Sequence, residues 1–240
     1  MNRRKTLIGA FILTVGIAVI AGSLVFLGPG KYGTVEGEIA DVLSRDAVWG
    51  ARIVVAGKST MTFRSKRYEL KGLSPGVYTL TASARNYGPI QKQIEVQNGR
   101  NLVNLYLQGE GIPDLKGILV FAAPVAKGLQ LEIRLTDSQG VAITHYPCLP
   151  FKLEGRLFVR DGDENQYQKG RKLFEGPVDL FWDAEDALAK NKGIIPWEMI
   201  DLDLSEKTAP HGVLEVVLDT PQGRFEYSTA EVKLLKEEVL

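Results

Sequence analysis

The chain begins with a long apolar run that is free of charge. No ionisable residue occurs over residues 7–27, and a basic cluster at residues 3–5 stands directly before them. About twenty helical residues, rising 1.5 Å each, cross a hydrocarbon layer of ~30 Å. The pattern predicts a single transmembrane helix that ends at Gly28-Pro29-Gly30. Basic residues next to a membrane span are usually cytoplasmic. Residues 1–30 are therefore predicted to be a cytoplasmic stub and anchor, and the rest of the chain is predicted to be extracytoplasmic.

A cleaved signal peptide is the alternative interpretation of the same segment. Small and permissive residues at Val19–Ala21 could precede a cleavage site, which would start the mature chain near Gly22 and make the protein secreted. Apolar character continues to Leu27, beyond the length that a signal peptide needs, and this favours a retained anchor.

From residue 33 to residue 108 the apolar positions alternate with polar ones, and turn residues recur at short intervals. This period of two is typical of strands with one buried face. We expect a seven-strand antiparallel β-sandwich. The expected strands are residues 33–41, 50–57, 59–63, 67–72, 76–84, 89–96 and 101–109.

One stretch of this region carries a specific turn and strand. Pro75 fixes one turn position and Gly76 can supply a positive φ at the next, so a type II turn is expected at Ser74–Val77. In the strand that follows, alternate residues from Val77 to Ser83 share an exposed face, and those from Tyr78 to Ala84 share the buried one. Tyr78 is expected to be a core aromatic residue whose hydroxyl reaches the rim.

Four segments together resemble the carboxypeptidase regulatory-like domain, which has a transthyretin-like β-sandwich fold. They are "GTVEGEIAD", "GARIVVAGKS", "YELKGLSPGVYTLTASARNYGP" and "IEVQNGRNLVNLYL", in this order, within residues 33–108. The resemblance implies an accessory, spacer or binding module of a surface or secreted protein, and related folds bind starch-like glycans. It carries over no catalytic residue. Asn86 stands where the family has a small glycine, but asparagine tolerates a left-handed backbone.

The remainder of the chain has weaker signals and resembles no family that we recognise. Residues 109–114, "GEGIPD", are the expected connector, and residues 115–240 are expected to form a second β-rich domain. Strands are expected at 116–124 and 128–136, with a hairpin around Thr220–Gly223. A short helix is expected within 181–193 because of its alanine content. At the C-terminus a strand into Leu235 is favoured over a helix capped at Ser228.

The composition excludes several classes of function. The 29 basic and 29 acidic residues balance, so no net field attracts nucleic acid, and we expect no nucleic-acid partner. The single cysteine, Cys148, and the two histidines, His145 and His211, lack metal-site spacing, and no cofactor is expected. The acidic segment at 161–165 does not fit a calcium loop, because Gln166 occupies the glycine position, so a solvated hairpin turn is favoured.

Three tryptophans are the candidate ligand-stacking residues: Trp49, Trp182 and Trp197. An exposed indole can stack on a sugar ring, although a buried tryptophan is the commoner case. No Gly-x-Ser-x-Gly motif or phosphate-binding glycine loop occurs, and the carboxylates Asp201 and Asp203 have no defined partner. We therefore expect no catalytic or metal-binding residues.

The sequence thus predicts a membrane-anchored, non-catalytic β-sandwich protein that mediates binding or assembly at the cell envelope. Its expected partners are the membrane, through residues 7–27, and envelope glycans or surface proteins. Two alternatives remain open: a carbohydrate-binding accessory module of a polysaccharide-processing system, and a hydrolase within residues 115–240.

Overall fold

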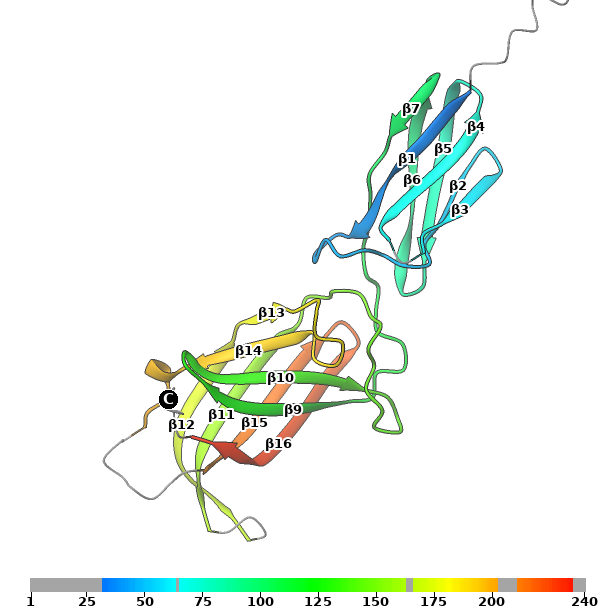
Figure 1. The fold of residues 1–240 in the computed structure, drawn as a ribbon. Coiled ribbons are helices and arrows are strands. Elements are labelled where there is room, and N and C mark those ends of the chain that lie inside the picture. Colours follow the sequence, from blue (N-terminus) through cyan, green and yellow to red (C-terminus); the bar gives the residue numbers. More distant parts are fainter. Residues whose placement is uncertain (1–31, 64, 163–165, 203–210, 235–240) are drawn as a thin grey trace, which may run out of the picture.

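The computed structural model describes residues 32–63, 65–162, 166–202 and 211–234. The predicted anchor, residues 7–27, lies outside the described residues. Within the described ranges, no helix has both the length and the apolar character that a membrane crossing requires. Two β domains follow one another along the chain, joined near residue 109 (Figure 1).

The first domain is a sandwich of two four-stranded sheets. One sheet contains β4, β1 and β7, with β8 also paired to β1, and the other has the order β3-β2-β5-β6. The core between the sheets includes Val35, Ile53, Leu80 and Leu107, none of which has exposed surface. The strands are β1 (Gly33–Asp41), β2 (Arg52–Val55), β3 (Lys58–Met61), β4 (Arg67–Leu73), β5 (Gly76–Ala84), β6 (Tyr87–Val96), β7 (Gly99–Leu102) and β8 (Leu105–Leu107).

This domain has eight strands where seven were expected, because the last predicted strand is divided at Val103. Both halves pair with β1 in parallel, so the sandwich is not fully antiparallel. The side-chain oxygen of Asn104 accepts the amide of Glu38 at 3.0 Å, which replaces a backbone partner across the break. Gly37 has no room for a side chain, because a Cβ there would collide with the Val103 carbonyl.

Strand β5 confirms the predicted division of faces. Leu80 and Ala82 are buried while Val77 and Thr79 are exposed, and the Tyr78 hydroxyl donates to the Ser74 carbonyl at 2.9 Å. The prediction of a type II turn before this strand is wrong. Gly76 has a φ of +155°, not the value near +80° that this turn requires. The reason is that β4 and β5 belong to opposite sheets, so the chain bends across the sandwich instead of forming a hairpin.

The second domain is also a sandwich of two four-stranded sheets, ordered β13-β14-β10-β9 and β12-β11-β15-β16. Its core packs four fully buried alternate residues of β10, from Leu129 to Leu135, against Leu157 and Leu214 of the facing sheet. The elements are β9 (Gly117–Val125), β10 (Gly128–Thr136), β11 (Lys152–Asp161), β12 (Gln168–Val178), β13 (Leu180–Trp182), β14 (Asn191–Pro196), the 3-10 turn η1 (Trp197–Met199), β15 (His211–Thr220) and β16 (Gly223–Lys233).

The helix predicted within residues 181–193 is wrong. The side chain of Asp183 accepts the amides of Glu185 and Asp186, and the side chain of Asp186 accepts those of Leu188 and Ala189. These local bonds compete with helical backbone bonds and hold a loop between β13 and β14.

The predicted hairpin around Thr220–Gly223 is confirmed, and β16 continues to Lys233, as favoured over a terminal helix. The turn of this hairpin also forms hydrogen bonds with the connector. The Gln222 side chain accepts the amide of Ile112 and donates to the carbonyl of the same residue, both at 2.6 Å. Ile112 is fully buried in the core of the second domain. The connector is therefore part of that domain and not a free linker.

Candidate functional site

An open cleft with a volume of about 900 Å³ lies between the two domains. Pockets of this size are typical of small-molecule sites. Its walls are five connecting segments, three of which belong to the second domain and its connector. The lining residues are Asp46, Ala47, Val48, Trp49, Arg85, Asn86, Tyr87, Pro113, Asp114, Asp137, Ile143, Thr144, His145, Tyr146, Pro147, Ala184, Glu185, Ala187 and Lys190.

The sequence shapes these segments through local polar turns. Asp137 accepts the amides of Gln139 and Val141 at 2.9 and 3.0 Å and ends β10 in the predicted turn. Asn86 and Asp114 both have a left-handed backbone, with φ values of +68° and +60°. Asn86 thus has the left-handed conformation that asparagine was expected to tolerate at this position. Asparagine and aspartate tolerate it at low cost, which is why sharp turns fit at these positions.

The loop between β1 and β2 reaches across to the second domain. Asp41, which is buried, accepts the amides of Leu43 and Ser44 with one oxygen and the amide of Cys148 with the other, the last at 3.1 Å. In the same loop, Asp46 accepts the indole N–H of Trp182 at 2.7 Å. Hydrogen bonds to a charged acceptor are stronger than neutral ones. Two carboxylates of the first domain thus anchor the second.

Backbone contacts also join the two domains. A single β-bridge joins Tyr87 to Gly109, and the amide of Glu110 donates to the Asn86 carbonyl at 3.0 Å. Gly109 lies so close to Pro147 that a Cβ would stand 2.5 Å from the Cβ of the proline. Only glycine fits at this position, so the approach of the two domains depends on it.

An aromatic cluster forms part of the cleft wall. The rings of Tyr146 and Trp182 meet edge to face, with centroids 5.5 Å apart, and the ammonium of Lys190 lies 5.4 and 5.3 Å from them. Burial lowers the pKa of Lys190, and the Asp46 carboxylate opposes this effect. Burial likewise raises the pKa of the Tyr146 and Tyr87 hydroxyls, with the charge of Asp41 adding to the effect at Tyr87. Both tyrosines therefore stay neutral hydrogen-bonding groups.

The three candidate tryptophans do not share one face. Trp49 lines the cleft and is 61% exposed. Trp182 is half-buried beside the cleft, where it bonds Asp46. Trp197 follows the opposite end of β14, packs against the core and donates its indole N–H to the Val125 carbonyl at 2.9 Å. The structure therefore leaves Trp49 as the tryptophan available for stacking, and it assigns Trp182 and Trp197 to packing.

The acidic residues of the second domain mostly serve its own structure. Asp183 and Asp186 hold their loop and share Lys192, at 2.8 and 3.0 Å. Asp201, for which the sequence defined no partner, pairs with Arg171. Asp161 ends β11 at the predicted hairpin turn, and Asp203 lies outside the described residues. No cluster of histidine, cysteine and carboxylate side chains in the described part of the chain could hold a metal ion.

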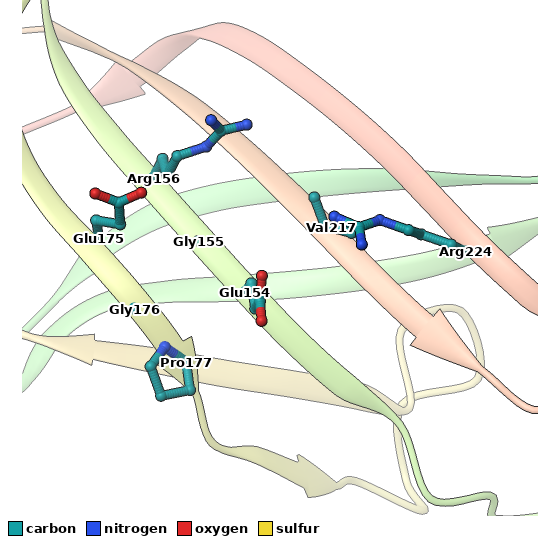
Figure 2. A pocket seen from close by; sticks show the side chains of 8 residues that line it. All are labelled: Glu154, Gly155, Arg156, Glu175, Gly176, Pro177, Val217 and Arg224. Carbon is teal, nitrogen blue, oxygen red and sulfur yellow. The ribbon is translucent and has the colours of Figure 1, made fainter.

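A second, smaller depression of about 370 Å³ lies on the outer face of the sheet β12-β11-β15-β16. Figure 2 shows Glu154, Arg156 and Glu175 standing on this face beside Arg224. Three of these charged groups form ion pairs: Arg156 contacts Glu215 at 3.3 Å, Glu175 pairs with Lys172, and Arg224 contacts Glu226 at 3.8 Å. This surface has the mixed charges of a solvated sheet face and lacks the aromatic lining of the cleft.

Sequence reasoning missed most of the cleft. Tyr87, Tyr146, Lys190 and Asp46 were not candidates, because each lies in a different connecting segment and only the folded chain brings them together. The available signal was the aromatic and proline content of "HYPCLPF", which is unusual for a connection between strands.

A two-domain β-sandwich protein with a cleft at the junction is the class that this geometry defines. Residues 34–108 match the sequence profile of the carboxypeptidase regulatory-like domain, so the first domain has the family that its motifs indicated. The match covers the first domain alone. No curated protein matches the chain.

Several solved structures share a limited likeness with the chain. A candidate carbohydrate-binding protein from Bacteroides uniformis is 12% identical, with a TM-score of 0.30, over 85% of this chain and 100% of that one. A DUF3823 family protein from Bacteroides ovatus is 13% identical, with a TM-score of 0.28, over 85% and 100%. BcpA, the major pilin subunit of Bacillus cereus, is 10% identical, with a TM-score of 0.30, over 85% and 69%. All three scores are below 0.5, so no function is carried over from them.

Proposed function

We propose that this protein is a membrane-anchored, extracytoplasmic binding protein of the cell envelope, and that its ligand binds in the cleft between the two domains. The observation that carries the proposal is the exposed indole of Trp49 at a cleft whose walls come from both domains. A large aromatic side chain left open to solvent beside a cavity is typical of recognition sites.

The proposal is that binding occurs without catalysis. Asp46 and Asp137 at the cleft are engaged by an indole N–H and by backbone amides, which favours structural roles for these carboxylates. The remaining carboxylates of the lining, Asp114 and Glu185, come from exposed positions in separate loops. The hydrolase alternative within residues 115–240 stays a prediction.

A carbohydrate ligand is the second candidate, and Trp49 favours it. The indole is accompanied in the lining by Arg85, Asn86 and Asp114, whose planar polar groups suit the paired hydroxyls of sugars. Tryptophan fluorescence during titration with cellohexaose, maltohexaose, xylohexaose and chitohexaose tests this candidate. We expect a saturable change that is lost in Trp49→Ala and kept in the matched control Trp197→Phe. If no sugar changes the emission, a carbohydrate ligand is rejected and a protein ligand remains.

Membrane anchoring is tested separately by protease treatment of intact cells, followed by the mass of the surviving fragment. We expect loss of both β domains and a protected fragment of about 30 residues, because one helix of about 20 residues spans the bilayer. Complete protection of the chain in cells with an accessible envelope would reverse the topology. A mature chain that begins near Gly22 would instead indicate secretion.

A further inference from the structure

The two sheets of the second domain have outer faces of different character. The sheet β12-β11-β15-β16 carries paired charges on its outer face (Figure 2). The sheet β13-β14-β10-β9 instead exposes Phe121 and Leu119 of β9, which are 46% and 36% exposed. Because these two residues are two positions apart on one strand, their side chains lie next to each other on the same face.

Two charged residues on the outer face of the sheet β13-β14-β10-β9 form no ion pair within the described chain. Glu132 and Arg134 project from β10, and neither forms an ion pair with any residue that the structure describes. The guanidinium of Arg134 lies over the Phe121 ring, 4.2 Å from its centroid. Its Nε is buried and has no hydrogen-bond partner in the described chain. Because this nitrogen is covered by the chain itself, a group from outside can meet the guanidinium only through its terminal nitrogens.

The four residues form a block with a fixed register. Glu132 pairs across the strands with Phe121, and Arg134 pairs with Leu119. A second copy could pack face to face against this surface, related to the first copy by a two-fold axis. The axis would lie between the two faces, at right angles to the strands and level with Ile133. It would place Glu132 opposite Arg134 of the partner subunit, and Phe121 opposite Leu119 of the partner subunit. The block is therefore self-complementary in both charge and apolar contact, as an isologous interface requires.

We infer that this face, defined by Leu119, Phe121, Glu132 and Arg134, binds a second copy of the same chain through that two-fold axis. Each dimer would gain two Glu132–Arg134 pairs and two Phe121–Leu119 contacts. Arginine and aromatic residues are enriched in protein interfaces, and opposite charges set the register. The dimer surface lies on a sheet and does not use the cleft residues, so this inference is independent of the proposed ligand.

Charge reversal tests the inference, because the pairing is reciprocal. The full chain in density-matched detergent is followed by sedimentation equilibrium. Each of Glu132→Arg and Arg134→Glu places like charges opposite each other, and each should weaken the dimer roughly a hundredfold. The double variant with both reversals restores opposite charges and should recover most of the affinity. Phe121→Ala should also weaken the dimer, and Met61→Glu, an exposed apolar position on the first domain, is the matched control.

Circular dichroism separates a folding defect from a loss of association. Weakened dimers in both single variants, with unchanged spectra and recovery in the double variant, support the inference. A wild-type chain that is monomeric at every concentration overturns it, and so does a dimer whose dissociation constant is insensitive to both single reversals. In either of those cases the face would serve a different partner or none.

Discussion

The indole nitrogen of Trp182 donates a hydrogen bond to the Asp46 carboxylate at 2.7 Å, although the two residues are 136 positions apart and belong to different domains. Together with the bond between Asp41 and the Cys148 amide, it fixes one side of the cleft. These contacts contribute to the shape of the cleft, so their loss should be visible in both stability and domain orientation.

Trp182→Phe removes this donor and keeps an aromatic ring against Tyr146. We expect a loss of about 2 kcal/mol in the free energy of unfolding, because the Asp46 carboxylate keeps its desolvation without its bond. Urea titration followed by circular dichroism measures this change. Small-angle scattering should also show a wider spread of domain orientations. The control Trp197→Phe removes an indole bond within the second domain, and an equal change in orientation there would contradict the role of Asp46.

Gln222→Ala removes both hydrogen bonds that hold Ile112 of the connector. We expect the second domain to lose about 1–2 kcal/mol in its free energy of unfolding. Amide hydrogen exchange should be faster at Ile112. Gln139→Ala changes the same residue type in another hairpin turn, where the side chain has no comparable role, and should leave exchange at Ile112 unchanged. Unaltered exchange in Gln222→Ala would show that the connector is held by apolar packing alone.

The loop between β13 and β14 should weaken in acid. Backbone amides, with Ala189 first, and the Lys192 ammonium lower the pKa of Asp186 from 3.8 to about 2. A carboxyl whose pKa is lowered by folding stabilises the native state above its unfolded pKa, and that contribution is lost as the pH falls. The loss should therefore occur between about pH 4 and pH 2.

Asp186→Asn should remove this part of the acid dependence, measured as the difference in unfolding free energy between the two ends of that range. Glu185→Gln, in the same loop, is the control because its side chain makes none of these bonds. An acid dependence that is the same in Asp186→Asn as in the wild type would mean that other carboxyl groups cause it.

Cys148 should react slowly with iodoacetamide at pH 8. Burial, assisted by the charges of Asp41 and Asp46, raises the pKa of its thiol to about 11. Since the thiolate is the reactive form, alkylation should be about a hundredfold slower than for an ordinary cysteine. The rate should rise with pH up to about 11, and the urea-unfolded chain should react at the normal rate. A rate profile that levels off near pH 8.5 would contradict a raised pKa.

The sequence predicted some elements to the residue and others not at all. Strands β1 (Gly33–Asp41) and β5 (Gly76–Ala84) begin and end as expected, because alternation and nearby turn residues are enough to define them. The helix expected within 181–193 was wrong, since alanine content could not outweigh the side-chain bonds of Asp183 and Asp186.

The site was less accessible to sequence reasoning than the fold. Trp49 was one of three tryptophans proposed together as ligand-stacking residues. Of these three, only Trp49 is among the residues that line the cleft. The difference between Trp49 and Trp182 depends on Asp46, and nothing local to residue 182 indicates a partner so far away in the chain. The cleft consists of loops from five places, so no periodicity marks it.

The parallel pairing of β1 with β7 and β8 also determines when the first domain can fold. Strand β1 is the first to be made, yet its neighbours on one side are residues 99–102 and 105–107. Such distant pairing is slow to form, because a long loop must close before any contact is gained. During synthesis the domain must remain open until Leu107 has emerged, so about seventy residues would stay unfolded beyond Gly33. The apolar positions of its strands would therefore stay exposed for longer than the small size of the domain suggests.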